Sequence, residues 1–312
     1  MLLHLVALTA PLFLLVLVGF VLSRFGWPRS ASDALTRFVF TVAVPTLLFR
    51  LMSDFSRLPR VDLRLLIAFF GGCLAVYAIG RLLGAWLFGM DGATQSVFAI
   101  GGIFSNNVLL GIPLAKVTLG DASLPAVSLV LVFNSLTLWT LVSVSVEWAR
   151  HRDLSVAGIA KTGRGVLRNP IVASILGGTG FGFLNWPLPG VIDQTLQMVS
   201  QAAVPLSLIA LGMGLAEFGV RAGWRESTAI AVLKLVAQPL VVYALARMLG
   251  LPPLETSAVV MLAALPVGAN VYLMARQFDV LGSAVASAIV LTTALAALTT
   301  PIALTLIGAV AP

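Results

Sequence analysis

The sequence predicts an all-α membrane protein with ten transmembrane helices, arranged as two inverted repeats of five. Its composition, the spacing of its apolar runs and its internal repetition together predict this fold. Of the 312 residues, 59% are hydrophobic and only 10% are charged, and the mean hydropathy is +1.05. Soluble proteins have about 45–50% apolar and about 25% charged residues, so this chain has too little polar surface for a water-soluble globule.

Ten apolar runs follow one another along the chain, each close to the ~20 residues that a helix needs to cross ~30 Å of hydrocarbon. The first run has no basic segment before it and no small-residue cleavage site after it, so we expect a permanent helix rather than a signal peptide. The runs cover residues 5–23, 36–52, 63–83, 93–116, 122–146, 169–185, 190–215, 227–247, 254–276 and 281–307.

The cations between the runs predict the orientation, because loops rich in Lys and Arg stay on the cytoplasmic side during insertion. With both termini outside, 12 cations lie inside and 6 outside. The inner set is Arg24, Arg29, Arg37, Arg81, Arg150, Arg152, Lys161, Arg164, Arg168, Arg221, Arg225 and Arg276; the outer set is Arg50, Arg57, Arg60, Arg64, Lys116 and Arg247. We therefore expect an integral protein of the cytoplasmic membrane with both termini outside, although the cluster at 57–64 argues the other way.

The two halves of the chain repeat one another at a near-constant offset. Pro11 corresponds to Pro170 and Trp27-Pro28 to Trp186-Pro187 at an offset of 159, and Ala43-Val44-Pro45 corresponds to Ala203-Val204-Pro205 at 160. Because each half has five spans, an odd number, the halves must point in opposite directions, as in many secondary transporters. We expect repeats at 1–148 and 169–312, joined by a basic cytoplasmic loop at 149–168.

The fourth and ninth runs carry polar, helix-breaking segments at corresponding positions. Proline frees backbone groups, and in a bilayer such groups persist only where protein or a water-filled cavity meets them. Two broken helices crossing near the midplane would direct half-helix N-termini, which attract anions, at one point. The candidate site residues there are Asn106, Asn107, Gly111, Pro113, Pro266, Gly268 and Asn270. The alternative is that these residues only pack helices together, since Gly, Pro and Asn are also common in helix contacts.

Lys234 is the only cation deep within a run, in the eighth span. A buried ammonium is costly unless it is paired or reaches water, so Lys234 is a candidate for ion coupling. The alternative is that its long side chain extends to the membrane surface.

The broken segments and several other motifs resemble the auxin efflux carrier family, whose members include plant auxin carriers and bacterial carriers often assigned organic acids. The resemblance covers most of the chain. It is carried by Ser105-Asn106-Asn107-Val108-Leu109-Leu110-Gly111-Ile112-Pro113-Leu114, Ala43-Val44-Pro45 with Leu47-Leu48-Phe49, Asn134-Ser135 with Trp139-Thr140-Leu141, Arg168-Asn169-Pro170, and Ala264-Leu265-Pro266 with Gly268, Ala275 and Phe278.

The resemblance implies a fold like that of bile-acid symporters and sodium/proton antiporters. Helices 1, 2, 6 and 7 would form a scaffold, helices 3–5 and 8–10 a transport domain, and the protein would work by an elevator mechanism, often as a homodimer. It also adds Asn134 and Trp139 to the candidate substrate site. Plant members have Tyr where Trp139 stands and a longer central loop, so auxin itself and regulation through that loop are not expected.

We therefore expect a secondary active transporter of a small organic anion, such as a mono- or dicarboxylate. The alternatives are a passive facilitator or channel and a sodium-coupled symporter on the same scaffold. The single cysteine, Cys73, cannot form an intramolecular disulfide, and we expect neither a cofactor, a bound metal nor a nucleic-acid partner. No hydrolytic motif or intramembrane acidic pair is present in the sequence, which disfavours an enzyme.

Overall fold

A computed structural model describes residues 2–53, 62–151, 170–184, 188–216 and 223–308, and in these ranges the secondary structure is helical apart from one isolated β-bridge. The helices, in chain order, are α1 Leu2–Arg24, α2 Arg29–Phe38, η1 Val39–Ala43, α3 Val44–Ser53, α4 Arg64–Phe88, α5 Gly92–Gly101, η3 Asn107–Gly111, α6 Ile112–Thr118, η4 Asp121–Ser123, α7 Leu124–His151, α9 Pro170–Phe183, α10 Gly190–Leu215, α11 Trp224–Val232, η5 Leu233–Ala237, α12 Gln238–Met248, α13 Pro253–Ala263, α14 Asn270–Phe278 and α15 Gly282–Leu306. The basic loop expected at 149–168 lies almost entirely outside the described residues.

Six of the described helices are long and apolar enough to cross a membrane, and they confirm a membrane protein. They cover Arg29–Arg50, Arg64–Phe88, Asp121–Arg150, Gly190–Leu215, Trp224–Met248 and Gly282–Leu306. Shorter apolar helices lie at Ala10–Arg24, Asn107–Thr118 and Pro253–Ala263. The last two belong to the regions where the sequence predicts broken spans, and a break shortens each continuous helix.

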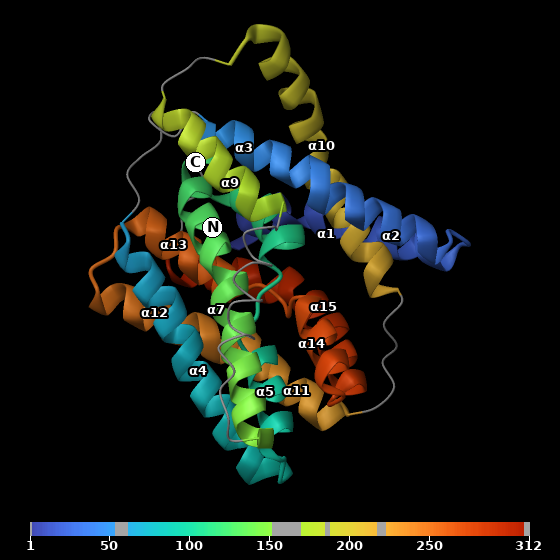
Figure 1. Cartoon of the computed structure of the whole chain (residues 1–312), viewed down its shortest axis with the longest axis vertical. Coiled ribbons are helices and arrows are strands. Elements are labelled where there is room, and N and C mark those ends of the chain that lie inside the picture. Colours follow the sequence, from blue (N-terminus) through green and yellow to red (C-terminus); the bar gives the residue numbers. More distant parts are fainter. Residues whose placement is uncertain (1, 54–61, 152–169, 185–187, 217–222, 309–312) are drawn as a thin grey trace.

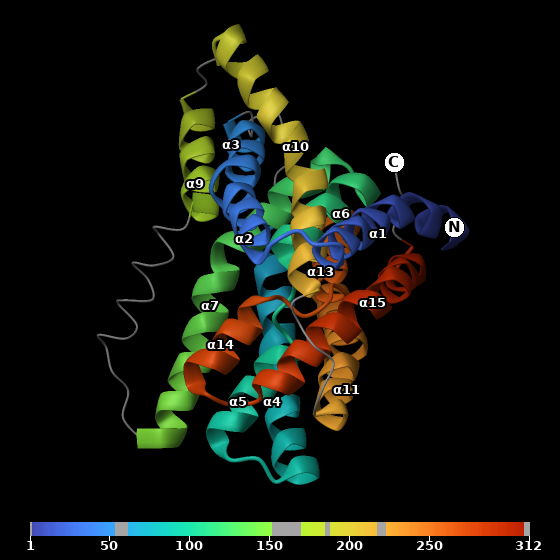
Figure 2. The same cartoon turned by 90° about the vertical axis from the view of Figure 1, so that its right-hand side faces the viewer.

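The helices pack into two groups. In one, α1 packs on α10, and α3 packs on both α9 and α10; these helices lie in the upper part of Figure 1. In the other, α4 packs on α5 and α12, α5 packs on α7, and α11 packs on α15. Contacts of α1 with α6 and α15 join the two groups, and Figure 2 shows α1 beside both of them.

Three helices contain a π-helical turn two residues before a proline. The turns η1, η3 and η5 end at Ala43, Gly111 and Ala237, and Pro45, Pro113 and Pro239 follow them. Proline has no N–H to donate and its ring displaces the carbonyl four residues earlier. A wider π turn accommodates that displacement without ending the helix.

Two long helical regions are interrupted, as the sequence predicts, but only one is interrupted at its proline. Residues 102–106 separate α5 from η3 and α6, and residues 264–269 separate α13 from α14. Pro266 lies within its break, whereas Pro113 lies in the first turn of α6, after the other break. The expectation that Pro113 marks a break is therefore wrong, because the preceding π turn accommodates it.

Candidate functional site

The two interrupted regions cross at their breaks, where short extended segments pair with each other. The Asn106 N–H donates to the Pro266 carbonyl at 2.9 Å, and the Gly268 N–H donates to the Phe104 carbonyl at 2.8 Å. These bonds flank an antiparallel bridge between Ser105 and Val267. A Cβ at position 268 would lie 3.0 Å from the Ser105 carbonyl oxygen, which explains the glycine there. The crossing satisfies backbone groups that could not stay free in a membrane interior.

The N-termini of two half-helices open onto one pocket beside this crossing. One begins at Asn107 and the other at Asn270. The Asn107 and Val271 amides donate to carbonyls just before each helix, so each helix end contributes its partial positive charge rather than free donors. The cavity has a volume of about 410 Å³, and its lining residues are all uncharged. They are Thr36, Phe40, Phe104, Ser105, Asn106, Asn107, Val108, Leu109, Leu131, Asn134, Gly268, Ala269, Asn270 and Leu273.

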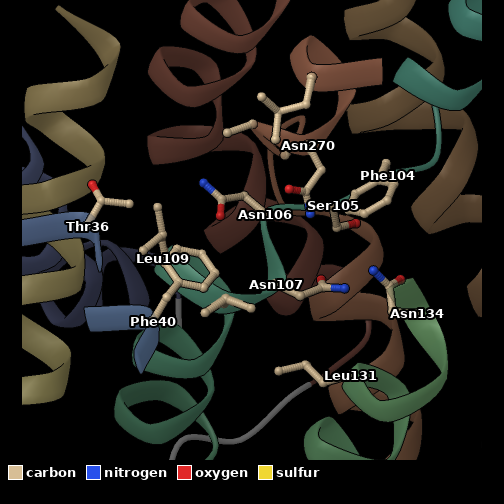
Figure 3. A pocket seen from close by; sticks show the side chains of 14 residues that line it. Thr36, Phe40, Phe104, Ser105, Asn106, Asn107, Leu109, Leu131, Asn134 and Asn270 are labelled. Carbon is tan, nitrogen blue, oxygen red and sulfur yellow. The ribbon is translucent and has the colours of Figure 1, made fainter. Parts of the chain in front are cut away.

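Several polar atoms at the pocket have no hydrogen-bond partner among the described residues. They are Ser105 Oγ, Asn106 Nδ2, Asn107 Oδ1 and Nδ2, and Asn134 Oδ1. The three asparagines are only 6%, 3% and 4% exposed, in chain order. Figure 3 shows the amides of Asn107 and Asn134 pointing toward one another, while that of Asn106 projects toward the side where Thr36 lies. Each buried unpaired polar group costs about 1–3 kcal/mol, so this concentration indicates a site for a polar ligand.

The carbonyls at the crossing are held from the neighbouring helices. Lys234 Nζ donates to the Ala263 carbonyl at 2.6 Å, and Gln238 Nε2 donates to the Ile103 carbonyl at 2.9 Å. On α15, Thr300 Oγ1 donates to the Ala264 carbonyl at 3.1 Å. Lys234 is fully buried, so the alternative that its side chain extends to the membrane surface is wrong.

The structure brings together five of the residues that the sequence singled out and places the others outside the lining of the cavity. Asn106, Asn107, Asn134, Gly268 and Asn270 line the pocket. The rest, which are Gly111, Pro113, Trp139, Lys234 and Pro266, do not line it.

Three of those five residues have other contacts that the structure shows. Pro266 accepts the crossing bond from Asn106, and Trp139 packs half-buried against the apolar core. A Cβ at Gly111 would lie 2.8 Å from Leu265 Cδ1, so that glycine allows close packing beside the crossing.

Sequence reasoning missed the apolar and hydroxyl residues of the pocket wall. Thr36 and Phe40 come from α2 and η1, and Leu131 comes from α7 one turn before Asn134. Nothing in the sequence marks these residues, since apolar side chains at helical spacing are typical of any buried helix face. Ser105 had a signal, because it directly precedes the two asparagines of the broken segment.

Comparison with known proteins shows the family of this chain. A family described as membrane transport protein matches residues 4–304, which is nearly the whole chain. The chain belongs to the auxin efflux carrier family of membrane transport proteins. The members of this family are transporters, and membership indicates a small-molecule substrate and a place within a membrane.

Relatives from bacteria, archaea and plants match over most of their length. A Rhizobium meliloti protein named "Putative malonate transporter" is 28% identical, over 94% of this chain and 92% of its own. An uncharacterized transporter of Methanocaldococcus jannaschii is 24% identical, over 90% and 91%. Auxin efflux carrier component 8 of Arabidopsis thaliana is 21% identical, over 88% and 90%.

Proposed function

We propose that this protein is a secondary active transporter of a small organic anion, which binds in the pocket beside the helix crossing. The single observation that carries the proposal is the concentration of unpartnered side-chain amide and hydroxyl groups around the start of η3 and at Asn134 on α7. A carboxylate accepts hydrogen bonds from amide N–H groups, and the partial positive charge of a helix N-terminus stabilises it without a buried arginine.

The pocket also limits the kind of anion that fits. Most of its polar groups lie at the crossing, and apolar side chains such as Phe40, Phe104 and Leu131 make up much of the remaining wall. A mono- or dicarboxylate with a compact apolar body complements both parts. The name of the Rhizobium relative makes malonate the first compound to test.

We propose that the chain is built from two inverted repeats. Reciprocal packing supports this, because α1 of the first half packs on α10 of the second, while α9 of the second packs on α3 of the first. The interrupted pair α5 and α6 and the pair α13 and α14 occupy corresponding places in the two halves. On this assignment, α1, α2, α3, α9 and α10 form the scaffold and the other helices form the transport domain, which moves by an elevator mechanism.

A thermal-stability screen of the purified protein tests the proposal, because a ligand that binds only the folded state raises its stability. We expect malonate or another mono- or dicarboxylate to raise the unfolding temperature in a saturable way. The uncharged diamide of the same acid is the matched control and should have no effect. Equal stabilisation by the diamide, or no stabilisation by any carboxylate, would contradict an anion site.

Uptake into proteoliposomes separates a secondary active transporter from a passive facilitator. We expect the anion identified by the screen to accumulate above its external concentration when an ion gradient is imposed with the membrane potential clamped at zero. Equilibration without accumulation under every imposed ion gradient at zero potential would favour the facilitator.

A further inference from the structure

Two side chains of the η5–α12 segment hold the two crossing segments. The transport reaction proposed above gives these two side chains no role. Lys234 and Gln238 lie four residues apart, at the π turn η5 and the start of α12, so they share a helix face. Lys234 donates to Ala263, the last residue of α13, and Gln238 donates to Ile103, in the break that follows α5. One segment thus bonds to both interrupted regions.

The charge of Lys234 has a specific partner in this arrangement. The last four carbonyls of a helix lack intrahelical donors and carry the negative end of its dipole. The Ala263 carbonyl is one of them, and the ammonium lies 2.6 Å from it. No carboxylate pairs with Lys234 among the residues that the structure describes. The amino group of Lys234 is therefore paired with the carbonyl end of α13 rather than with an acid.

We infer that Lys234 and Gln238 are positioning residues that hold the two crossing segments in one mutual register, and so fix the half-helix N-termini that face the pocket. The segments bond to each other through Asn106 with Pro266 and through Gly268 with Phe104. A displacement of either segment therefore also displaces the other. Neither Lys234 nor Gln238 touches the pocket, so their effect on an anion is indirect.

Hydrogen exchange of the Asn106 and Gly268 amides tests this inference without any substrate. In Lys234→Met and in Gln238→Met, we expect both amides to exchange faster, including the amide in the segment that the changed side chain does not contact. A hydrogen bond from a charged donor contributes about 1.5–3 kcal/mol and a neutral one about 0.5–1.5 kcal/mol. The acceleration should then be about tenfold to a hundredfold for Lys234→Met and about twofold to tenfold for Gln238→Met. Lys234→Gln, which keeps a donor without the charge, should lie between wild type and Lys234→Met.

Ser227→Ala is the matched control. Ser227 is buried on α11, the helix that leads into η5, and its Oγ donates to the Ala284 carbonyl of α15 at 2.8 Å, away from the crossing. Its loss should lower the unfolding temperature and leave exchange at Asn106 and Gly268 unchanged. If Lys234→Met or Gln238→Met accelerates exchange only in the segment that its own side chain contacts, or does not accelerate it, the inference is wrong.

Binding of malonate, measured by calorimetry, adds a second readout that rests on the proposed function. We expect its dissociation constant to rise at least fivefold in Lys234→Met and to stay within twofold of wild type in Ser227→Ala. If malonate binds the wild type and its affinity is the same in Lys234→Met, the crossing does not position the site and the inference is wrong. If malonate fails to bind the wild type, that result counts against malonate as the substrate, and the exchange rates decide the inference by themselves.

Discussion

Asn107 is buried with neither atom of its side-chain amide paired to another described residue. A core that only needed to be stable would place an apolar side chain there, because burying an unpaired amide costs about 1–3 kcal/mol per group. Ser105 and Asn106 add further unpaired atoms beside it. The cost is explained if these groups are kept for a ligand, and it separates this site from ordinary asparagine contacts between helices.

Replacing Asn107 by Ala should separate binding from stability. We expect the variant to bind a carboxylate more weakly by about 0.5–1.5 kcal/mol for each lost hydrogen bond, while the unliganded protein unfolds at a temperature equal to or above that of wild type. Asn270→Ala should weaken binding similarly. Affinity of the wild type should be micromolar or weaker, since only neutral donors are present.

Thr292→Val is the contrasting control for the Asn107 prediction. Thr292 Oγ1 accepts from the Val267 N–H and donates to the Ala288 carbonyl, so its loss should lower the unfolding temperature. Calorimetric unfolding with and without ligand measures the change in ligand binding and the change in unfolding temperature. Wild-type affinity in both asparagine variants would place the site elsewhere and leave the crossing as a packing point only.

Lys234 gives a prediction about ion coupling. The Lys234 amino group already donates to the carbonyl end of α13, and a helix C-terminus favours one nearby positive charge. We expect transport without sodium, so that uptake into proteoliposomes is the same in sodium and in choline buffers. Lys234→Ala should lower uptake. Strict dependence on a sodium gradient, or full activity of Lys234→Ala, would contradict this role.

At the scale of elements, proline has two different consequences in this chain. Where a π turn precedes it, as at Pro45, Pro113 and Pro239, the helix continues. Pro266 instead lies in an extended crossing segment, and its carbonyl accepts the bond from Asn106. The sequence shows the same residue type in both places, and the path of the backbone decides which consequence follows.

Pro113→Ala and Pro266→Ala should therefore differ. Alanine at 266 restores an N–H that can continue α13, which would move the crossing carbonyl away from Asn106; we expect loss of ligand stabilisation and of transport at normal expression. Alanine at 113 only lets the π turn η3 relax toward an α turn, because the break lies upstream, so binding should be retained. Thermal shifts with malonate measure ligand stabilisation in each variant, and uptake assays measure transport. Equal effects of the two substitutions would show that the π turn, not the crossing, sets the site.

At the scale of the whole molecule, the orientation in the membrane rests on the distribution of cations. We expect the loop at 149–168 to be cytoplasmic. A cysteine at Gly158, introduced with Cys73→Ser, should be shielded from membrane-impermeant thiol reagents in intact cells. Ala122→Cys, an exposed position in η4, should be labelled in the same background, because the expected orientation places its loop outside. Labelling at 158 without permeabilisation would show that the orientation is opposite to the one predicted.

The sequence by itself determined that the chain lies in a membrane, which family it belongs to and which segments are interrupted. These follow from composition and from local patterns such as Ser105-Asn106-Asn107 and Pro266-Val267-Gly268, whose effects act within one helix turn. It also identified the asparagines of the pocket, from their place in apolar spans and from the family resemblance.

Only the tertiary structure decided which of these residues share one cavity. Three features join segments far apart in the chain. They are the pairing of Ser105 with Val267, the part of the pocket wall that Thr36 and Phe40 supply, and the carbonyl partners of Lys234 and Gln238. Apolar spans look alike in sequence, because the same Leu, Val and Ala face lipid or protein equally well. The partner of a given helix face is therefore set by packing in three dimensions, and the chemistry of the pocket depends on that choice.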